Sequence, residues 1–140
     1  IGNKTFYGCK SLANINIPSS VTSIGEEAFS SCKNLTNVTI QEGVTSISKY
    51  AFSYCSSLTS ISIPDSVTTI NERAFYECLN LTSINIPNSV TSIGTCAFYR
   101  CSRLTINYTG TEEQWNAISK GVHWNNGCPS NMVINYNYQG

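Results

Sequence analysis

The residues best suited to chemistry in this chain are its seven cysteines. Five of them recur at a constant step of 23 residues, and each follows a phenylalanine by three positions. A thiol in such a row could serve as a metal ligand, as half of a disulfide bond, as a nucleophile or only as a packing group. The row consists of Cys9, Cys32, Cys55, Cys78 and Cys101.

Geometry favours packing for this row. Equivalent positions in adjacent coils of a repeat protein lie about 4.8 Å apart with parallel side chains, whereas a disulfide bond needs converging Cβ atoms at about 3.5–4.5 Å. A straight row of thiols also cannot surround a zinc ion, which takes four convergent ligands. Because cysteine is among the most often buried residues, we expect the row to be a structural ladder inside the protein.

Cys96 and Cys128 lie outside the row. Cys96 takes the place of Glu27, Tyr50 and Arg73 in the other units, so we expect it at the surface of the final coil. Cys128 falls in the segment expected to cover that coil. A disulfide bond between the two is possible in an oxidising compartment, and two free thiols are the alternative.

Other arrangements for catalysis are not evident. His123 is the single histidine, and no nucleophile stands beside it at a recognisable spacing. Glu112 and Glu113 are better explained as charges at a helix start. We therefore expect no catalytic residues, no metal site, no cofactor and no enzymatic activity. Eight basic and eight acidic residues cancel, which gives no indication of a nucleic-acid partner.

The same step of 23 residues governs the rest of the chain, which predicts a solenoid of stacked coils. One unit reads Leu35-x-x-Val38-x-Ile40, continues through Val44 and Ile47, and ends in Ala-Phe-x-x-Cys-x-x-Leu. Its first part alternates apolar and small polar residues, as expected for a strand. The stretch around the phenylalanine has helix-like spacing and predicts a turn of α-helix or 3₁₀-helix that directs the phenylalanine inward. The first unit starts in mid-repeat, so we expect residues 1–107 to hold about four and a half units, truncated at the N-terminal side.

The repeat changes after Leu104, and residues 108–140 are expected to form a cap of strand, helix and strand. Thr111 with Gln114 matches a capping box, and Trp115 and Ile118 fall on one helical face. Lys120-Gly121 is expected to end the helix. The final alternating stretch predicts a strand with polar residues on one side and, on the other, Met132, Ile134, Tyr136 and Tyr138.

The pattern I-P-x-S-V-T-x-I-G-x-x-A-F-x-x-C-x-x-L resembles the BspA-like branch of the leucine-rich repeat family, found in bacterial and protist surface proteins. The final Trp-bearing helix and strand are similar to the C-terminal segment of many such proteins. The fold class expected is therefore a leucine-rich repeat solenoid, a β-rich right-handed coil. One departure is that Ser20, Gly43, Ser66 and Ser89 stand where the wider family has Asn or Cys. The ladder of backbone bonds from asparagine side chains is therefore expected to be weakened or replaced by serine hydroxyls.

Two surfaces are candidates for contact with other molecules. If Leu35, Val38 and Ile40 point inward, the small polar residues between them face solvent in a stacked row. The candidate binding face consists of Asn14, Asn16, Asn37, Thr39, Ser60, Ser62, Ser83 and Asn85. A possible aromatic stripe consists of Tyr7, Tyr54, Tyr76 and Tyr99.

The resemblance implies a non-enzymatic module of a cell-surface or secreted protein that adheres to an extracellular or host-surface protein or to a glycan. The residues themselves support only a neutral, polar, repetitive surface. The alternative from another class is a structural spacer or stalk within a larger surface protein, and the bland outward residues do not separate the two. No apolar run in the sequence approaches the length of a membrane span.

Overall fold

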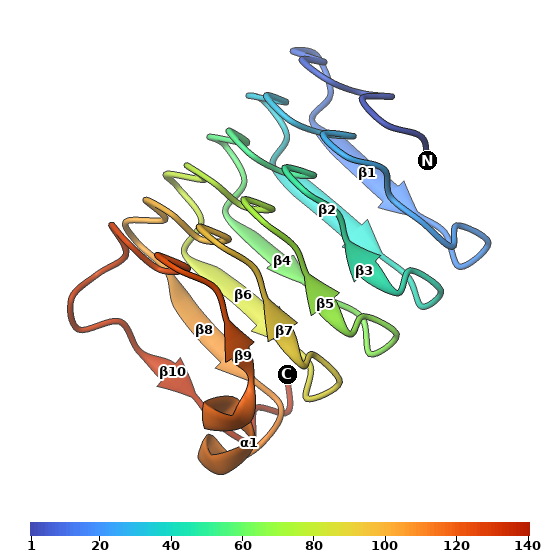
Figure 1. Ribbon diagram of the computed structural model, residues 1–140. Coiled ribbons are helices and arrows are strands. Elements are labelled where there is room, and N and C mark those ends of the chain that lie inside the picture. The colour runs from blue at the N-terminus through green and yellow to red at the C-terminus, as the bar shows by residue number, and fades with distance from the viewer.

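The computed structural model describes residues 1–140 as a solenoid of parallel strands with about five turns (Figure 1). Equivalent residues of successive coils stack on one another, so the step of 23 residues in the sequence becomes a repeat along the solenoid axis. Almost all of the contacts that hold a coil are therefore made with the coil before it and the coil after it.

One side of every coil is a strand of a six-stranded parallel sheet. Its strands are β1 (Asn14–Ile17), β2 (Asn37–Ile40), β4 (Ser60–Ser62), β6 (Ser83–Ile86), β8 (Thr105–Tyr108) and β10 (Ile134–Asn135). The register places like residues opposite each other, as in the pairing of Ile61 with Ile84. The alternation of β2 is the predicted one, since Val38 and Ile40 are buried while Asn37 and Thr39 are exposed.

A second side of the coil carries a shorter parallel sheet of four strands. These are β3 (Ser46–Ile47), β5 (Thr69–Ile70), β7 (Ser92–Ile93) and β9 (Ser119–Lys120). Between the two sheets the expected serine bonds are present, because the hydroxyls of Ser66 and Ser89 donate to the carbonyls of Val44 and Val67, each at 2.7 Å.

The third side, around each phenylalanine, is a pair of tight turns closed by bonds between residues three apart, as in a 3₁₀-helix and not as in an α-helix. Its N–H groups alternate between two kinds of partner: Ala28 donates to Gly25 three residues back, whereas Phe29 donates to Ala51 of the next coil. Two backbone positions per coil have positive φ, as at Glu27 (55°) and Ser31 (61°). A helix would direct every N–H along its own axis, so these left-handed residues allow one coil to bond to the next.

The core between the three sides is a single apolar column built from one residue of each kind per coil. The rings of Phe6, Phe29, Phe52, Phe75 and Phe98 stack at centroid distances of 5.2–5.6 Å with nearly parallel planes. Buried leucines, isoleucines, valines and alanines fill the space around them. Four of these phenylalanines have no exposed surface and are among the largest fully buried side chains, so they contribute much of the apolar burial that stabilises the fold. They are Phe29, Phe52, Phe75 and Phe98.

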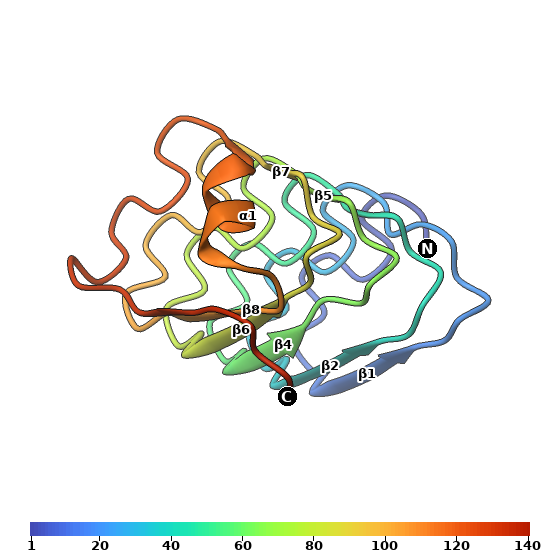
Figure 2. The same cartoon turned by 90° about the horizontal axis from the view of Figure 1, so that it is seen from below.

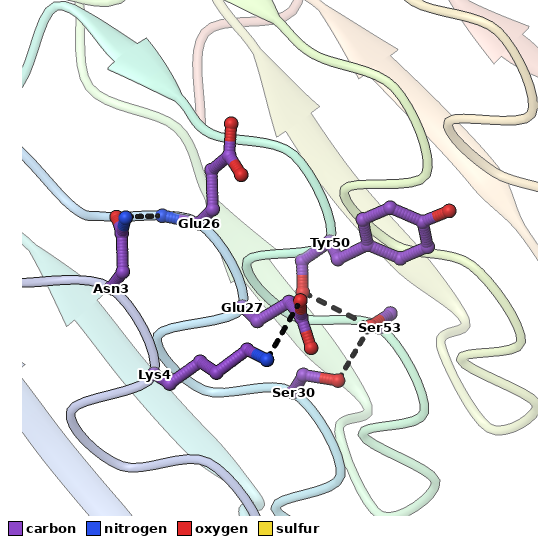
Figure 3. A network of polar contacts seen from close by, with 7 residues as sticks. All are labelled: Asn3, Lys4, Glu26, Glu27, Ser30, Tyr50 and Ser53. Carbon is purple, nitrogen blue, oxygen red and sulfur yellow. Dashed lines mark hydrogen bonds and ion pairs between the residues drawn. The ribbon is translucent and has the colours of Figure 1, made fainter.

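Polar side chains also bond from coil to coil beside this core (Figure 3). Ser30 and Ser53 are buried, and their hydroxyl oxygens lie 2.8 Å apart. The Ser53 hydroxyl donates in turn to the carbonyl of Tyr50 at 3.0 Å. At the surface nearby, Lys4 lies 3.6 Å from the carboxylate of Glu27. The buried hydroxyls are thus satisfied within the repeat.

Two strands of residues 108–140, the segment expected to form a cap of strand, helix and strand, continue the two sheets of the solenoid. Strand β9 joins the short sheet beside β7, and β10 joins the long sheet beside β8. The helix α1 (Glu112–Ala117) is inserted between these sheets, at the edge of the last coils (Figure 1). Its capping box at Thr111 and Gln114 is confirmed. Its predicted end is wrong, because Lys120 lies in β9 and its amino group donates to the carbonyl of Trp115 at 2.7 Å.

Candidate binding groove

A groove of about 410 Å³ runs across the outward face of strands β2, β4, β6 and β8. Six of the eight residues of the predicted binding face line it, and they are Asn37, Thr39, Ser60, Ser62, Ser83 and Asn85. Asn14 and Asn16 lie on the same face but beyond the groove, on β1 at the N-terminal edge of the sheet. The structure therefore brings most of the predicted face together in one concave surface.

The amide side chains of this face form a ladder along the solenoid axis. Asn85 donates to the hydroxyl of Ser62 at 2.8 Å and accepts from Asn107 at 2.9 Å. Asn135 donates to Asn107 at 2.8 Å, and in the neighbouring column of the sheet Asn37 donates to Asn14 at 2.7 Å. In each of these bonds the amide nitrogen points toward the preceding coil, so the orientation of the amides is fixed before any ligand arrives.

Two polar residues that line the groove, Asn107 and Tyr138, were not part of the binding face predicted from the sequence. Asn107 pairs with Asn85 in the parallel register at a distance of 22 residues, whereas the 23-residue step points to Tyr108, so continuing the repeat beyond Leu104 would not have found it. The alternation predicted that Tyr138 lies on the same side as Tyr136, which packs against the core. This prediction was wrong, because the strand ends at Asn135 and Asn137 has a positive φ of 54°, which breaks the alternation.

Tyr138 is held beside the groove by its backbone. Its N–H donates to the carbonyl of Tyr108 at 2.9 Å, and the N–H of Asn137 donates to the carbonyl of Gly110 at 2.8 Å. The C-terminal segment consequently ends on the outer side of the long sheet (Figure 2). The tyrosine adds an aromatic side chain to a groove whose other polar residues are amides and hydroxyls.

The predicted aromatic stripe is only partly continuous. The rings of Tyr76 and Tyr99 stack at 4.8 Å, and Tyr54 meets Tyr76 edge to face at 5.5 Å. Tyr7 is separate, since the small residues Ser30 and Ser53 occupy its column in the next two coils. The guanidinium of Arg73 lies over the rings of Tyr50 and Tyr76, at 5.5 and 5.8 Å from their centroids.

The repeated cysteines do more than fill space. The thiol of Cys55 donates to the carbonyl of Phe29 in the preceding coil at 3.2 Å, and Cys32, Cys78 and Cys101 make the same bond to their own preceding phenylalanines. Burial raises the pKa of Cys55 to about 12, and it raises the pKa of Cys78 and Cys101 as well. Thiols in this state are poor nucleophiles at neutral pH, because the thiolate is the reactive form.

Cys96 and Cys128 are both free, so the possible disulfide bond between them is not formed. Cys128 instead extends the buried row, since its thiol donates to the carbonyl of Phe98 at 3.2 Å. Cys96 is 8% exposed and not at the surface as expected. The reason is the next coil, whose Val122 carbonyl accepts the N–H of Cys96 at 3.1 Å. The two thiols thus belong to different columns of the repeat.

The remaining residues with side chains suited to catalysis or metal binding do not gather into a metal site. His123 is exposed, and its Nδ1 lies 2.8 Å from the side-chain amide of Asn126. Glu112 and Glu113 occupy the first turn of α1, as predicted. No three His, Cys, Asp or Glu side chains come together in a way that could hold a metal ion. None of the helices has the length and apolar character needed to cross a membrane.

Parallel strands, one per 23-residue coil, with an inward leucine and isoleucine column and a polar outward groove, define a leucine-rich repeat solenoid. The model of the BspA type leucine-rich repeat region matches residues 1–118 in six copies. The chain belongs to this family.

Solved structures of bacterial proteins agree with this assignment. A leucine-rich cell surface protein from Faecalibacterium prausnitzii A2-165 is 42% identical with a TM-score of 0.83, over 85% of this chain and 32% of that protein. The leucine-rich repeat protein of T. pallidum is 30% identical with a TM-score of 0.75, over 96% of this chain and 65% of that one.

A leucine-rich repeat protein from Eubacterium ventriosum is 27% identical with a TM-score of 0.77, over 91% of this chain and 33% of that protein. The chain therefore spans about a third of the F. prausnitzii and E. ventriosum proteins. No curated protein matches the chain.

Proposed function

We propose that this chain is a recognition module of a cell-surface or secreted protein, and that it binds an extracellular or host-surface protein or a glycan through the groove on its long sheet. The observation that carries the proposal is the groove itself, a concavity of about 410 Å³ lined by side chains from four successive coils. Its function is binding without catalysis, because hydroxyls and amides supply hydrogen bonds but no acid, base or nucleophile matched to a reaction.

The hydrogen-bonded ladder supports this role. A side chain that is already held in place loses little conformational entropy when a partner binds, so its bonds contribute more of their energy to affinity. Asn85 and Asn107 are held in this way, each by bonds to both neighbouring coils. The similarity to a cell surface protein of F. prausnitzii supports the location.

A substitution in the groove tests the proposal. Ser60 is exposed on β4 and lines the groove, so Ser60→Arg places a long charged side chain across it. The chain and its variant are screened against immobilised matrix proteins and an array of glycans. We expect a partner that binds the chain and loses affinity at least tenfold for Ser60→Arg, a change of about 1.4 kcal/mol.

Thr59→Arg is the matched control, because Thr59 is exposed and adjacent in sequence but outside the groove. It carries the same added charge and should leave binding unchanged. Binding that is equally insensitive to both substitutions would place the contact elsewhere on the molecule and contradict the proposal.

A structural spacer is the second candidate, and one observation favours it. The outward amides are hydrogen-bonded to each other from coil to coil, which stiffens the solenoid whether or not a partner exists. A spacer predicts that no protein or glycan binds the chain in the screen while another region of the parent protein does bind.

A further inference from the structure

We infer that the groove takes a neutral oligosaccharide, with Tyr138 as the wall against which a sugar ring packs. This inference rests on the proposed function and names the class of ligand for the same groove. It is carried by the charge of the lining, the hydrogen-bonding capacity left on its side chains, and the position of the tyrosine.

The lining of the groove contains no charged side chain. Its residues are Asn, Ser, Thr, Val, Ile and one Tyr, all drawn from β2, β4, β6, β8 and the C-terminal segment. A peptide with charged residues or an acidic glycan would lose hydration of its charges without gaining an ion pair in return. A ligand that is polar and uncharged avoids this cost.

The amide ladder leaves each asparagine able to bond a ligand. A primary amide has two N–H donors and an oxygen with two lone pairs. The ladder uses one donor and one acceptor of Asn85, and likewise of Asn107, so each retains one of both kinds. A sugar hydroxyl is both donor and acceptor. Neighbouring hydroxyls on one ring can therefore accept from the free N–H of an amide and donate to the free lone pair of its oxygen.

Free hydroxyls alternate with these amides. Ser60, Ser83 and Thr39 line the groove, and none of their hydroxyl groups takes part in a hydrogen bond within the protein. Because adjacent parallel strands lie about 4.8 Å apart, like groups recur along the groove at that interval. Such a row suits a chain of similar sugar units lying along the solenoid axis.

Tyr138 supplies the apolar contact. Pyranose rings have one face of C–H groups, and a tyrosine ring offers a flat apolar surface to pack against it. The backbone bonds from Asn137 and Tyr138 to the segment Tyr108–Gly110 hold the main chain from which the tyrosine side chain projects. A groove of about 410 Å³ is within the range of about 300–1,000 Å³ that small-ligand sites occupy, which allows a short stretch of a glycan.

The test uses the full chain and an array of neutral and acidic oligosaccharides, followed by calorimetric titration with the neutral hexasaccharides maltohexaose, cellohexaose, xylohexaose and mannohexaose. Hexagalacturonate serves as the acidic counterpart. We expect a neutral oligosaccharide to bind and the acidic hexamer to bind at least tenfold more weakly. Tyr138→Ala should weaken binding of the neutral ligand roughly tenfold, whereas Tyr138→Phe, which keeps the ring, should stay within about threefold.

Tyr7→Ala is the control, because Tyr7 is 53% exposed, lies on the turn side of the first coil and does not line the groove. Its binding should equal that of the unchanged chain, and circular dichroism should show the same fold for all variants. Equal losses for Tyr138→Ala and Tyr7→Ala, or binding of acidic glycans only, would overturn the inference.

The outcomes also separate this inference from the proposed function. A protein partner that is lost with Ser60→Arg, with no neutral glycan bound, would overturn the glycan and leave the groove as a recognition site. Binding of neither proteins nor glycans would overturn both.

Discussion

The thiol of Cys78 donates a hydrogen bond of 3.1 Å to the main-chain carbonyl of Phe52, one coil earlier in the solenoid. The same bond recurs at Cys32, Cys55, Cys101 and Cys128, and the acceptor is always the main-chain carbonyl of the phenylalanine in the preceding coil. A thiol is a weak donor and a good apolar filler. The column therefore joins adjacent coils while leaving the core apolar.

Removing one of these thiols should destabilise the chain measurably. Cys78→Ala deletes a fully buried sulfur and its bond to Phe52, and we expect a loss of about 1–2 kcal/mol in the free energy of unfolding. Urea denaturation followed by circular dichroism measures it. Cys9→Ala is the control, since Cys9 is only half-buried in the first coil, and equal losses at both positions would contradict the role of the column.

The buried thiols predict a loss of stability at alkaline pH. Burial raises the pKa of Cys55 to about 12 from an ordinary 9.0, so above about pH 9 the unfolded chain releases this proton while the folded chain keeps it. The unfolded state is thereby favoured, by about 1.4 kcal/mol per pH unit between pH 9 and 12 for this one thiol. Unfolding free energies measured from pH 8 to 11 should fall less steeply for Cys55→Ala than for the unchanged chain.

The buried hydroxyl pair predicts non-additive substitutions. Ser53→Ala leaves the hydroxyl of Ser30 buried without its partner, and we expect a cost of about 1–3 kcal/mol. Replacing both serines by alanine removes the stranded group as well, so the double variant should be less destabilised than the sum of the single ones. A double-mutant cycle in urea measures the difference, and simple additivity would show that the two hydroxyls do not interact.

Trp124 in the last coil should be important for the stability of the fold. Trp124 meets the end of the phenylalanine stack edge to face, with its centroid 6.3 Å from Phe98, and also contacts Trp115 at 5.9 Å. Trp124→Ala should lower the free energy of unfolding by about 2–4 kcal/mol, because it uncovers the end of the core. Val122→Ala is the neighbouring control, since Val122 is 65% exposed and should change stability by less than about 0.5 kcal/mol.

The repeat period was sufficient to predict the solenoid, its inward columns and the outward face. Each coil meets only its neighbours, so a periodic sequence maps directly onto a periodic structure. Val38 and Ile40 are buried and Asn37 is exposed as the alternation requires. The segment around Phe52 was expected to be one turn of α-helix or 3₁₀-helix, and its division into two separate turns was not foreseen, because its left-handed residues Tyr50 and Tyr54 are not types that signal positive φ.

The end of the chain was harder to predict because its repeat is interrupted. Helix α1 lengthens the last coil, so that Cys128 follows Cys101 by 27 residues and not 23, and Cys128 was not seen to extend the cysteine row. Tyr138 was placed on the same side as Tyr136 because the alternation of the strand was continued past Asn135. Its place in the groove depends on a single left-handed residue, Asn137, which period alone does not reveal.

The central claim, that the outward groove is the binding site, is tested most directly by nuclear magnetic resonance of the asparagine side-chain amides during titration with a partner found in the screen. The amides of Asn85 and Asn107 lie in the groove, whereas those of Asn34 and Asn80 donate to the carbonyls of Lys10 and Ser56 outside it. We predict that the signals of Asn85 and Asn107 shift while those of Asn34 and Asn80 stay. Shifts confined to Asn34 and Asn80 would contradict the account.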